Sequence, residues 1–204
     1  MKKLLALTLM LIVLLLCAAA FADGEQKSGL FTYKLKGNGT ALITEFDWEK
    51  NGNQDVYVPR MLDGYTVTEI GDSAFSANWL KLDYSWKSNH ASELAVILPD
   101  TIKVIGEKAF FSCNQIATLN IPSSVQIIGD GAFSNTYMKC SVASSNEYFA
   151  TINSVLYNKK TKSLLYCPKG IVGYDNPLII PDGIKKYAAM HFIIMMDGEA
   201  IVTM

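Results

Sequence analysis

A short pattern that occurs four times constrains this chain more than any other feature. Each copy begins with an aliphatic residue and a proline and continues, after a turn, toward Ile-Gly-x-x-Ala-Phe. Three copies are regular, at residues 58–75, 98–110 and 121–133, and a worn fourth copy covers residues 180–192. Internal repeats with a period of about 20 to 50 residues are typical of solenoids, in which each unit buries its apolar face against the next. The sequence therefore predicts stacked coils rather than a closed globule.

The positions that the copies share have physical roles. Proline ends a strand because it has no N–H to donate, glycine permits a sharp corner, and Ala-Phe fills the interior. The acidic residues Asp72 and Asp130 are expected to cap short helical turns after the glycine. These structural repeat residues are Pro59, Ile70, Gly71, Phe75, Pro99, Ile105, Gly106, Phe110, Pro122, Ile128, Gly129, Phe133, Pro181 and Phe192.

The N-terminal residues 1–22 have the composition of a secretory signal peptide. Two lysines precede an apolar stretch, and Ala20 and Ala22 form the small-residue pattern of a cleavage site. Cleavage after Ala22 is expected, which would make the protein secreted or attached to the cell surface. An uncleaved membrane anchor and a lipoprotein modified at Cys17 are the alternatives.

The charge and the cysteine content limit the classes of partner and ligand that this chain is expected to bind. Removal of residues 1–22 leaves 16 basic and 19 acidic residues, and no basic cluster is evident, so nucleic acid and anionic membranes are not expected partners. No further stretch is apolar enough to span a membrane after cleavage. Cys113, Cys140 and Cys167 remain, without a Cys-x-x-Cys motif, so we expect buried thiols and no metal or cofactor. One disulfide among them is the alternative.

The rest of the chain is organised around the repeats. Residues 23–57 read as a linker and a hairpin that caps the open end of the solenoid, with a turn at residues 37–39. Residues 58–204 read as the solenoid, with copies starting near residues 58, 98, 121 and 180. A hairpin insertion is expected at about residues 138–179, with a polar turn at 158–162.

The repeated pattern of Ile-Pro followed by Val-x-x-Ile-Gly-x-x-Ala-Phe resembles the BspA-like leucine-rich repeat family. Residues 146–168 are similar to an inter-repeat element of that family, and Phe31-x-Tyr33 is similar to its usual start. The resemblance covers roughly residues 30–192. It implies an α/β, strand-rich leucine-rich repeat solenoid in a secreted or surface protein of bacteria. Members bind host or matrix proteins or other bacteria, and the family supplies no catalytic residues.

The C-terminal end departs from the family pattern. Tyr187 and Ala188 stand where Ile and Gly are expected, and no further repeat follows Phe192. Two interpretations remain open. The chain is a naturally short or truncated member, or its C-terminal edge associates with a second copy.

Aromatic residues in the insertion at residues 78–92 are candidate partner-binding residues. They are Trp79, Tyr84, Trp86 and His90. Aromatic side chains on loops often anchor interfaces, although these could also fold back and shield the core. The two histidines have no neighbouring nucleophile motif, so an enzyme is not expected. The leading hypothesis is a protein-binding or adhesion module, and the alternative is a structural surface protein or the remnant of a longer array.

Overall fold

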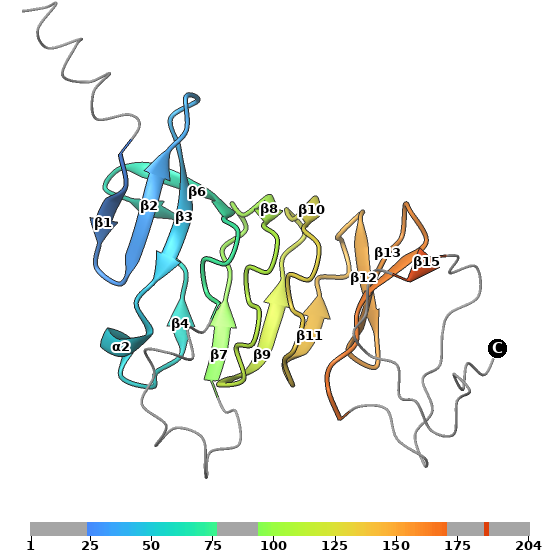
Figure 1. The fold of residues 1–204 in the computed structure, drawn as a ribbon. Coiled ribbons are helices and arrows are strands. Elements are labelled where there is room, and N and C mark those ends of the chain that lie inside the picture. Colours follow the sequence, from blue (N-terminus) through green and yellow to red (C-terminus); the bar gives the residue numbers. More distant parts are fainter. Residues whose placement is uncertain (1–23, 77–93, 171–185, 188–204) are drawn as a thin grey trace, which may run out of the picture.

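The computed structural model describes residues 24–76, 94–170 and 186–187 of the 204-residue chain (Figure 1). The chain forms a strand-rich solenoid of about four turns with little helix. The one α-helix in the described residues is α2 (Trp48–Asn51), so the helical part of the predicted α/β class is small. The expected signal peptide, the aromatic insertion and most of the fourth copy, including Pro181 and Phe192, lie outside the described residues.

Sheet A runs along one side of the coils. Its strands are β1 (Gln26–Ser28), β2 (Phe31–Leu35), β3 (Thr40–Phe46), β5 (Met61–Leu62), β6 (Tyr65–Ile70), β8 (Val104–Ile105) and β10 (Ile127–Ile128). The hydrogen-bonded order is β1-β2-β3-β6-β8-β10, with β5 beside β6. β2 and β3 form the expected antiparallel hairpin, and β3 then pairs parallel with β6. The N-terminal hairpin therefore continues directly into the coils.

Sheet B forms a second side of the same coils. Its strands are β4 (Val56–Tyr57), β7 (Leu94–Ile97), β9 (Ile116–Ile121) and β11 (Lys139–Val142). All neighbours pair parallel, in the order β11-β9-β7-β4, and Figure 1 shows them side by side. Proline follows one or two residues after β4, β7 and β9, which is the expected place for a residue that cannot donate to the ladder. Because β11 belongs to sheet B, the insertion begins after Val142 rather than near residue 138.

The chain turns sharply after Gly71, Gly106 and Gly129, and we call these three places the glycine corners. They are turns, and the capped helical turns predicted there do not form. The backbone N–H of Phe75 donates to the carbonyl of Ala109 in the next coil at 2.8 Å. The Asp72 carboxylate likewise accepts from the Glu107 backbone N–H of the next coil at 2.7 Å instead of capping its own turn. A helix would use these donors within one coil, so bonding between coils replaces the helix.

A column of aromatic rings runs through the core. Ring centroids lie 4.9 Å apart for Phe46 and Phe75, 4.8 Å for Phe75 and Phe110, and 5.8 Å for Phe110 and Phe133. All four side chains are buried. Tyr166 tilts against Phe133 at 5.6 Å and ends the column. The isoleucines of the repeated motif, Ile70, Ile105 and Ile128, form a second row. Ile70 and Ile105 are buried, whereas Ile128 is only half-buried.

Sheet C closes the C-terminal end of the described coils. Its strands are β12 (Phe149–Ile152), β13 (Val155–Asn158), β14 (Ser163–Tyr166) and β15 (Lys186–Tyr187), in that order. The sequence predicts β13 and β14 but not β12, which adds a third antiparallel strand. β15 pairs parallel with β14 and holds the place in the fourth copy that β8 and β10 hold in earlier copies.

Candidate interaction surface

The outward face of sheet B presents a regular row of exposed side chains. Side chains alternate along its strands, as a half-buried sheet requires. On β9, Leu119 and Ile121 are buried, whereas Thr118 and Asn120 are exposed. The strand register aligns these outward positions from coil to coil. We define the sheet B face by its central outward row, which consists of Tyr57, Ile97, Asn120 and Ser141.

The N-terminal half of the sheet B face is apolar. Tyr57 is 68% exposed and lies beside Ile97, which is 40% exposed. In the other half, the Ser141 hydroxyl donates to the Asn120 side-chain oxygen at 3.0 Å. A single exposed apolar residue is ordinary, but a neighbouring pair on a rigid sheet has the composition of an interface anchor.

Polar links bracket the apolar pair at both ends of its two strands. Before the pair, the Asp55 carboxylate accepts from the backbone N–H of Ala95 at 2.8 Å. Beyond the pair, the Arg60 guanidinium and the Asp100 carboxylate form an exposed ion pair. An apolar centre with a polar rim is the usual anatomy of a protein–protein interface.

The glycine corners hold the coils in register beneath this face. A Cβ placed on Gly106 would lie 2.6 Å from the Asp72 backbone nitrogen and 2.7 Å from the Gly71 carbonyl carbon. A Cβ on Gly129 would lie 2.5 Å from the Glu107 backbone nitrogen. Such distances are below any normal contact, so only glycine permits this approach of neighbouring coils.

Asn146 joins the hairpin of sheet C to the third coil. Its side-chain nitrogen donates to the carbonyl oxygens of Pro122 at 2.9 Å and Val125 at 3.0 Å. Its side-chain oxygen accepts from the backbone N–H groups of Tyr148 and Phe149, both at 2.8 Å. Asn146 is 1% exposed, so its amide is buried and all of its donors and both lone pairs are used. The sequence predicts no role for the Asn146 side chain, because no periodic pattern marks it.

Tyr166 forms the second polar attachment of sheet C. Its hydroxyl donates to the carbonyl oxygen of Met138 at 2.8 Å and lies 2.7 Å from the Thr136 hydroxyl. Burial, and secondarily the neighbouring Cys140 thiol, raises the pKa of Tyr166 above its ordinary value. The hydroxyl therefore stays neutral and remains a donor.

The three cysteine side chains of the described coils are buried thiols. Cys113, Cys140 and Cys167 are all buried, as expected for small apolar residues, and burial raises the pKa of Cys167 to about 11. A raised pKa makes a thiol inert as a nucleophile. Within residues 24–76 and 94–170, no group of three His, Cys, Asp or Glu side chains could hold a metal ion. Those residues also include no helix long and apolar enough to cross a membrane.

The acidic residues Asp47 and Glu49 lie at the start of α2. Desolvation acts to raise the pKa of Asp47, but the Lys50 backbone N–H and the Lys27 ammonium outweigh it and hold that pKa below its ordinary value. Asp47 is the N-cap of α2, and Glu49 is exposed in its first turn. Asp47 is therefore held as a hydrogen-bonded carboxylate at the start of α2.

The expectation that no basic cluster exists needs correction. Residues 131–170 contain five lysines and one carboxylate, Glu147. Three of these lysines, Lys159, Lys160 and Lys162, lie in the turn between β13 and β14. The near-neutral charge of the whole chain hides this local excess.

The predicted aromatic partner-binding residues Trp79, Tyr84, Trp86 and His90 lie outside the described residues, as do Ala20 and Ala22 of the expected cleavage site. They remain predictions. The sheet B face emerged only from the structure. The sequence marks Tyr57 and Ile97 just before Val58-Pro59 and Leu98-Pro99, but their alignment depends on the strand register.

Stacked parallel coils of this kind define a leucine-rich-repeat-type solenoid. Residues 83–171 match the family model described as BspA type Leucine rich repeat region (6 copies). This match confirms the resemblance to the BspA-type leucine-rich repeat family that is seen in the repeated pattern. No curated protein matches the chain.

Several crystal structures of bacterial proteins are similar. A leucine-rich repeat protein from Eubacterium ventriosum ATCC 27560 is 21% identical, with a TM-score of 0.46 over 79% of this chain and 54% of that one. A leucine-rich repeat protein from Bacteroides capillosus ATCC 29799 is 22% identical, with a TM-score of 0.40 over 59% of this chain and 99% of that one. A leucine rich cell surface protein from Faecalibacterium prausnitzii A2-165 is 16% identical, with a TM-score of 0.27 over 72% and 62% of the two chains. The present chain thus spans about half of the Eubacterium protein.

Proposed function

We propose that this chain is a secreted or cell-surface binding module that recognises another protein through the sheet B face. The observation that carries the proposal is the exposed pair of Tyr57 and Ile97, aligned on neighbouring strands and bracketed by polar links. Family membership supports a surface-type protein of bacteria without an enzymatic role, and the signal-like N-terminus supports export.

The sheet B face suits recognition because its geometry is fixed before a partner arrives. Parallel strands, glycine corners and the aromatic column hold each outward side chain in register with the next. A preorganised surface loses little conformational entropy on binding, so more of the contact energy appears as affinity. Tyrosine is also among the residues enriched in interface hot spots.

The test compares the affinity lost when exposed apolar residues are substituted on sheet B with the affinity lost on the same kind of substitution on sheet A. The mature chain, starting at residue 23, is titrated against a panel of purified host extracellular-matrix proteins. In the double variant Tyr57→Ala/Ile97→Ala, affinity for a bound protein should fall at least about tenfold, as expected for hot-spot residues. The matched control is Ile127→Ala, which removes a side chain that is 57% exposed on sheet A.

Three results would count against the proposal. Equal loss of affinity in the Ile127→Ala control would show that the sheet B face is not special. Retained affinity in Tyr57→Ala/Ile97→Ala, with loss in Trp86→Ala, would move the anchor to the insertion at residues 78–92. If no partner binds at all, the structural-protein alternative is favoured.

The intact mass of the exported protein tests cleavage after Ala22.

A further inference from the structure

A rigid turn rich in lysine joins β13 and β14. We call residues 158–163 the lysine turn, since it contains Lys159, Lys160 and Lys162. The Asn158 side-chain oxygen accepts from the backbone N–H groups of Lys160 at 2.8 Å and Thr161 at 2.9 Å. The hydroxyls of Thr161 and Ser163 lie 2.6 Å apart. These local bonds fix the backbone from which the ammonium groups project.

The charges of the lysine turn have no carboxylate partner among the described residues. The six ion pairs found there all lie between residues 25 and 108. Residues 24–76 and 94–130 contain 11 acidic and 7 basic residues, whereas residues 131–170 contain five lysines and Glu147 alone. The C-terminal end of the described coils is therefore positive, and the remainder is negative. Such a field attracts an anion to one end of the molecule.

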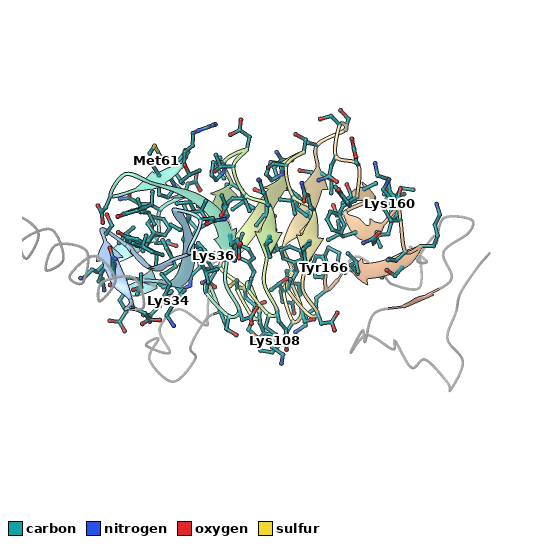
Figure 2. The ribbon with its side chains drawn as sticks, turned by 90° about the horizontal axis from the view of Figure 1, so that it is seen from above. Lys34, Lys36, Met61, Lys108, Lys160 and Tyr166 are labelled. Atoms are coloured by element: carbon teal, nitrogen blue, oxygen red, sulfur yellow. The ribbon has the colours of Figure 1, made fainter. Side chains whose placement is uncertain are left out.

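The surroundings of the lysine turn are aromatic and polar. The Lys160 ammonium lies 5.9 Å from the centre of the Tyr148 ring, and the Lys159 ammonium donates to the backbone carbonyl of Asn146. Figure 2 shows Lys160 on the C-terminal hairpin, well separated from Lys34, Lys36 and Lys108. A half-buried ring beside exposed ammonium groups combines a flat apolar surface with positive charge.

We propose that the lysine turn binds an anionic polysaccharide, a chain of sugars that carries sulfate or carboxylate groups. Repeated anions along a flexible polymer can reach several ammonium groups at once, and a sugar ring can lie on Tyr148. A folded protein partner fits less well, because a stable interface buries about 800 Å² on each side around apolar anchors. Nucleic acid also fits less well, because the turn has no arginine for bidentate contacts. This site is separate from the sheet B face and does not depend on its function.

The test uses two probes, a heparin oligosaccharide and polygalacturonate, titrated into the mature chain at low salt. The variant Lys160→Ala/Lys162→Ala should bind the probes about tenfold more weakly. The matched control is Lys34→Ala/Lys36→Ala, which removes the same charge from lysines that are already paired. Lys36 lies 2.6 Å from Glu69, and Lys34 lies 3.7 Å from Glu25. The control should change affinity less than about twofold.

A second variant tests the charge directly. Glu147→Lys removes the one carboxylate of this region and should tighten binding about threefold. Equal weakening by the two lysine variants, or no binding of either probe at low salt, would overturn the proposal. Tighter binding of single-stranded DNA or of phosphatidylserine vesicles than of both probes would also overturn it.

Discussion

The regular coils and the C-terminal hairpin are stabilised in different ways. In the coils, backbone hydrogen bonds between neighbouring coils and stacked rings repeat from coil to coil, so many similar contacts contribute to the stability of the fold. The hairpin of sheet C buries Phe149 and Leu156 in the same core, and the side chains of Asn146 and Tyr166 add hydrogen bonds to the coils that have no repeated counterpart. The coils therefore propagate by repeating one motif, whereas the C-terminal hairpin also uses polar residues that occur only once.

The largest expected effect is in the coils. Phe110→Ala should lower the free energy of unfolding by about 3–5 kcal/mol, because it leaves a cavity in the middle of the aromatic column. Denaturant unfolding measures this. Phe111→Ala is the control, since its neighbouring side chain is only half-buried and should cost less. Equal effects would contradict the stacked column.

A smaller and more local effect is expected at the hairpin. Asn146→Ala removes four side-chain hydrogen bonds and should cost about 3 kcal/mol. Hydrogen exchange should show lost protection in β13 and β14 while β8 keeps its protection. Asn120→Ala, an exposed residue with one bond to Ser141, should change little. Uniform loss of protection over all coils would show that the two regions are not separate.

The glycine corners provide a third comparison. Gly106→Ala places a Cβ against the backbone of the preceding coil and should cost about 1–3 kcal/mol through overpacking. Gly37→Ala is the control, because its Cβ would meet nothing within 4 Å. Thermal unfolding of both variants distinguishes a packed corner from an ordinary turn. The same midpoint for both would refute the close approach of the coils.

The smallest expected effect concerns pH at the N-terminal hairpin. The Tyr33 hydroxyl lies 2.8 Å from Asp63, and desolvation together with this carboxylate raises the pKa of Tyr33 to about 12. Because the folded state holds this proton more tightly, its stabilisation is full below pH 10 and is lost between about pH 10 and 12. The stability difference between wild type and Tyr33→Phe should shrink over that range. A constant difference would mean that Tyr33 has an ordinary pKa.

The sequence predicts the coils well and their ends poorly. The spacing of Ile-Pro and Ala-Phe predicts the coil order and the inward phenylalanines. The N-terminal hairpin is predicted by a different signal, the turn residues at positions 37–39. The glycine corners were mistaken for helical turns. Their second residue has positive φ in every regular copy, at Ser73, Lys108 and Gly131, but only the last is a glycine.

The sequence also fails to predict the sheet B face and the attachment of sheet C, but for a different reason. The sheet B face depends on which residues of distant segments are aligned, and that register is set by backbone pairing between coils. Asn146 and Tyr166 act through partners 20 or more positions away in the chain. No local spacing encodes such contacts, so a single sequence could not reveal them.

The stacking of successive coils is tested most directly by proton–proton contacts between phenylalanine rings. With Phe selectively labelled and assigned by single substitutions, nuclear Overhauser spectra should connect Phe75 to Phe110 and Phe110 to Phe133. The centroid distances of 4.8 and 5.8 Å predict both contacts. A well-folded protein that lacks them would contradict the solenoid described above.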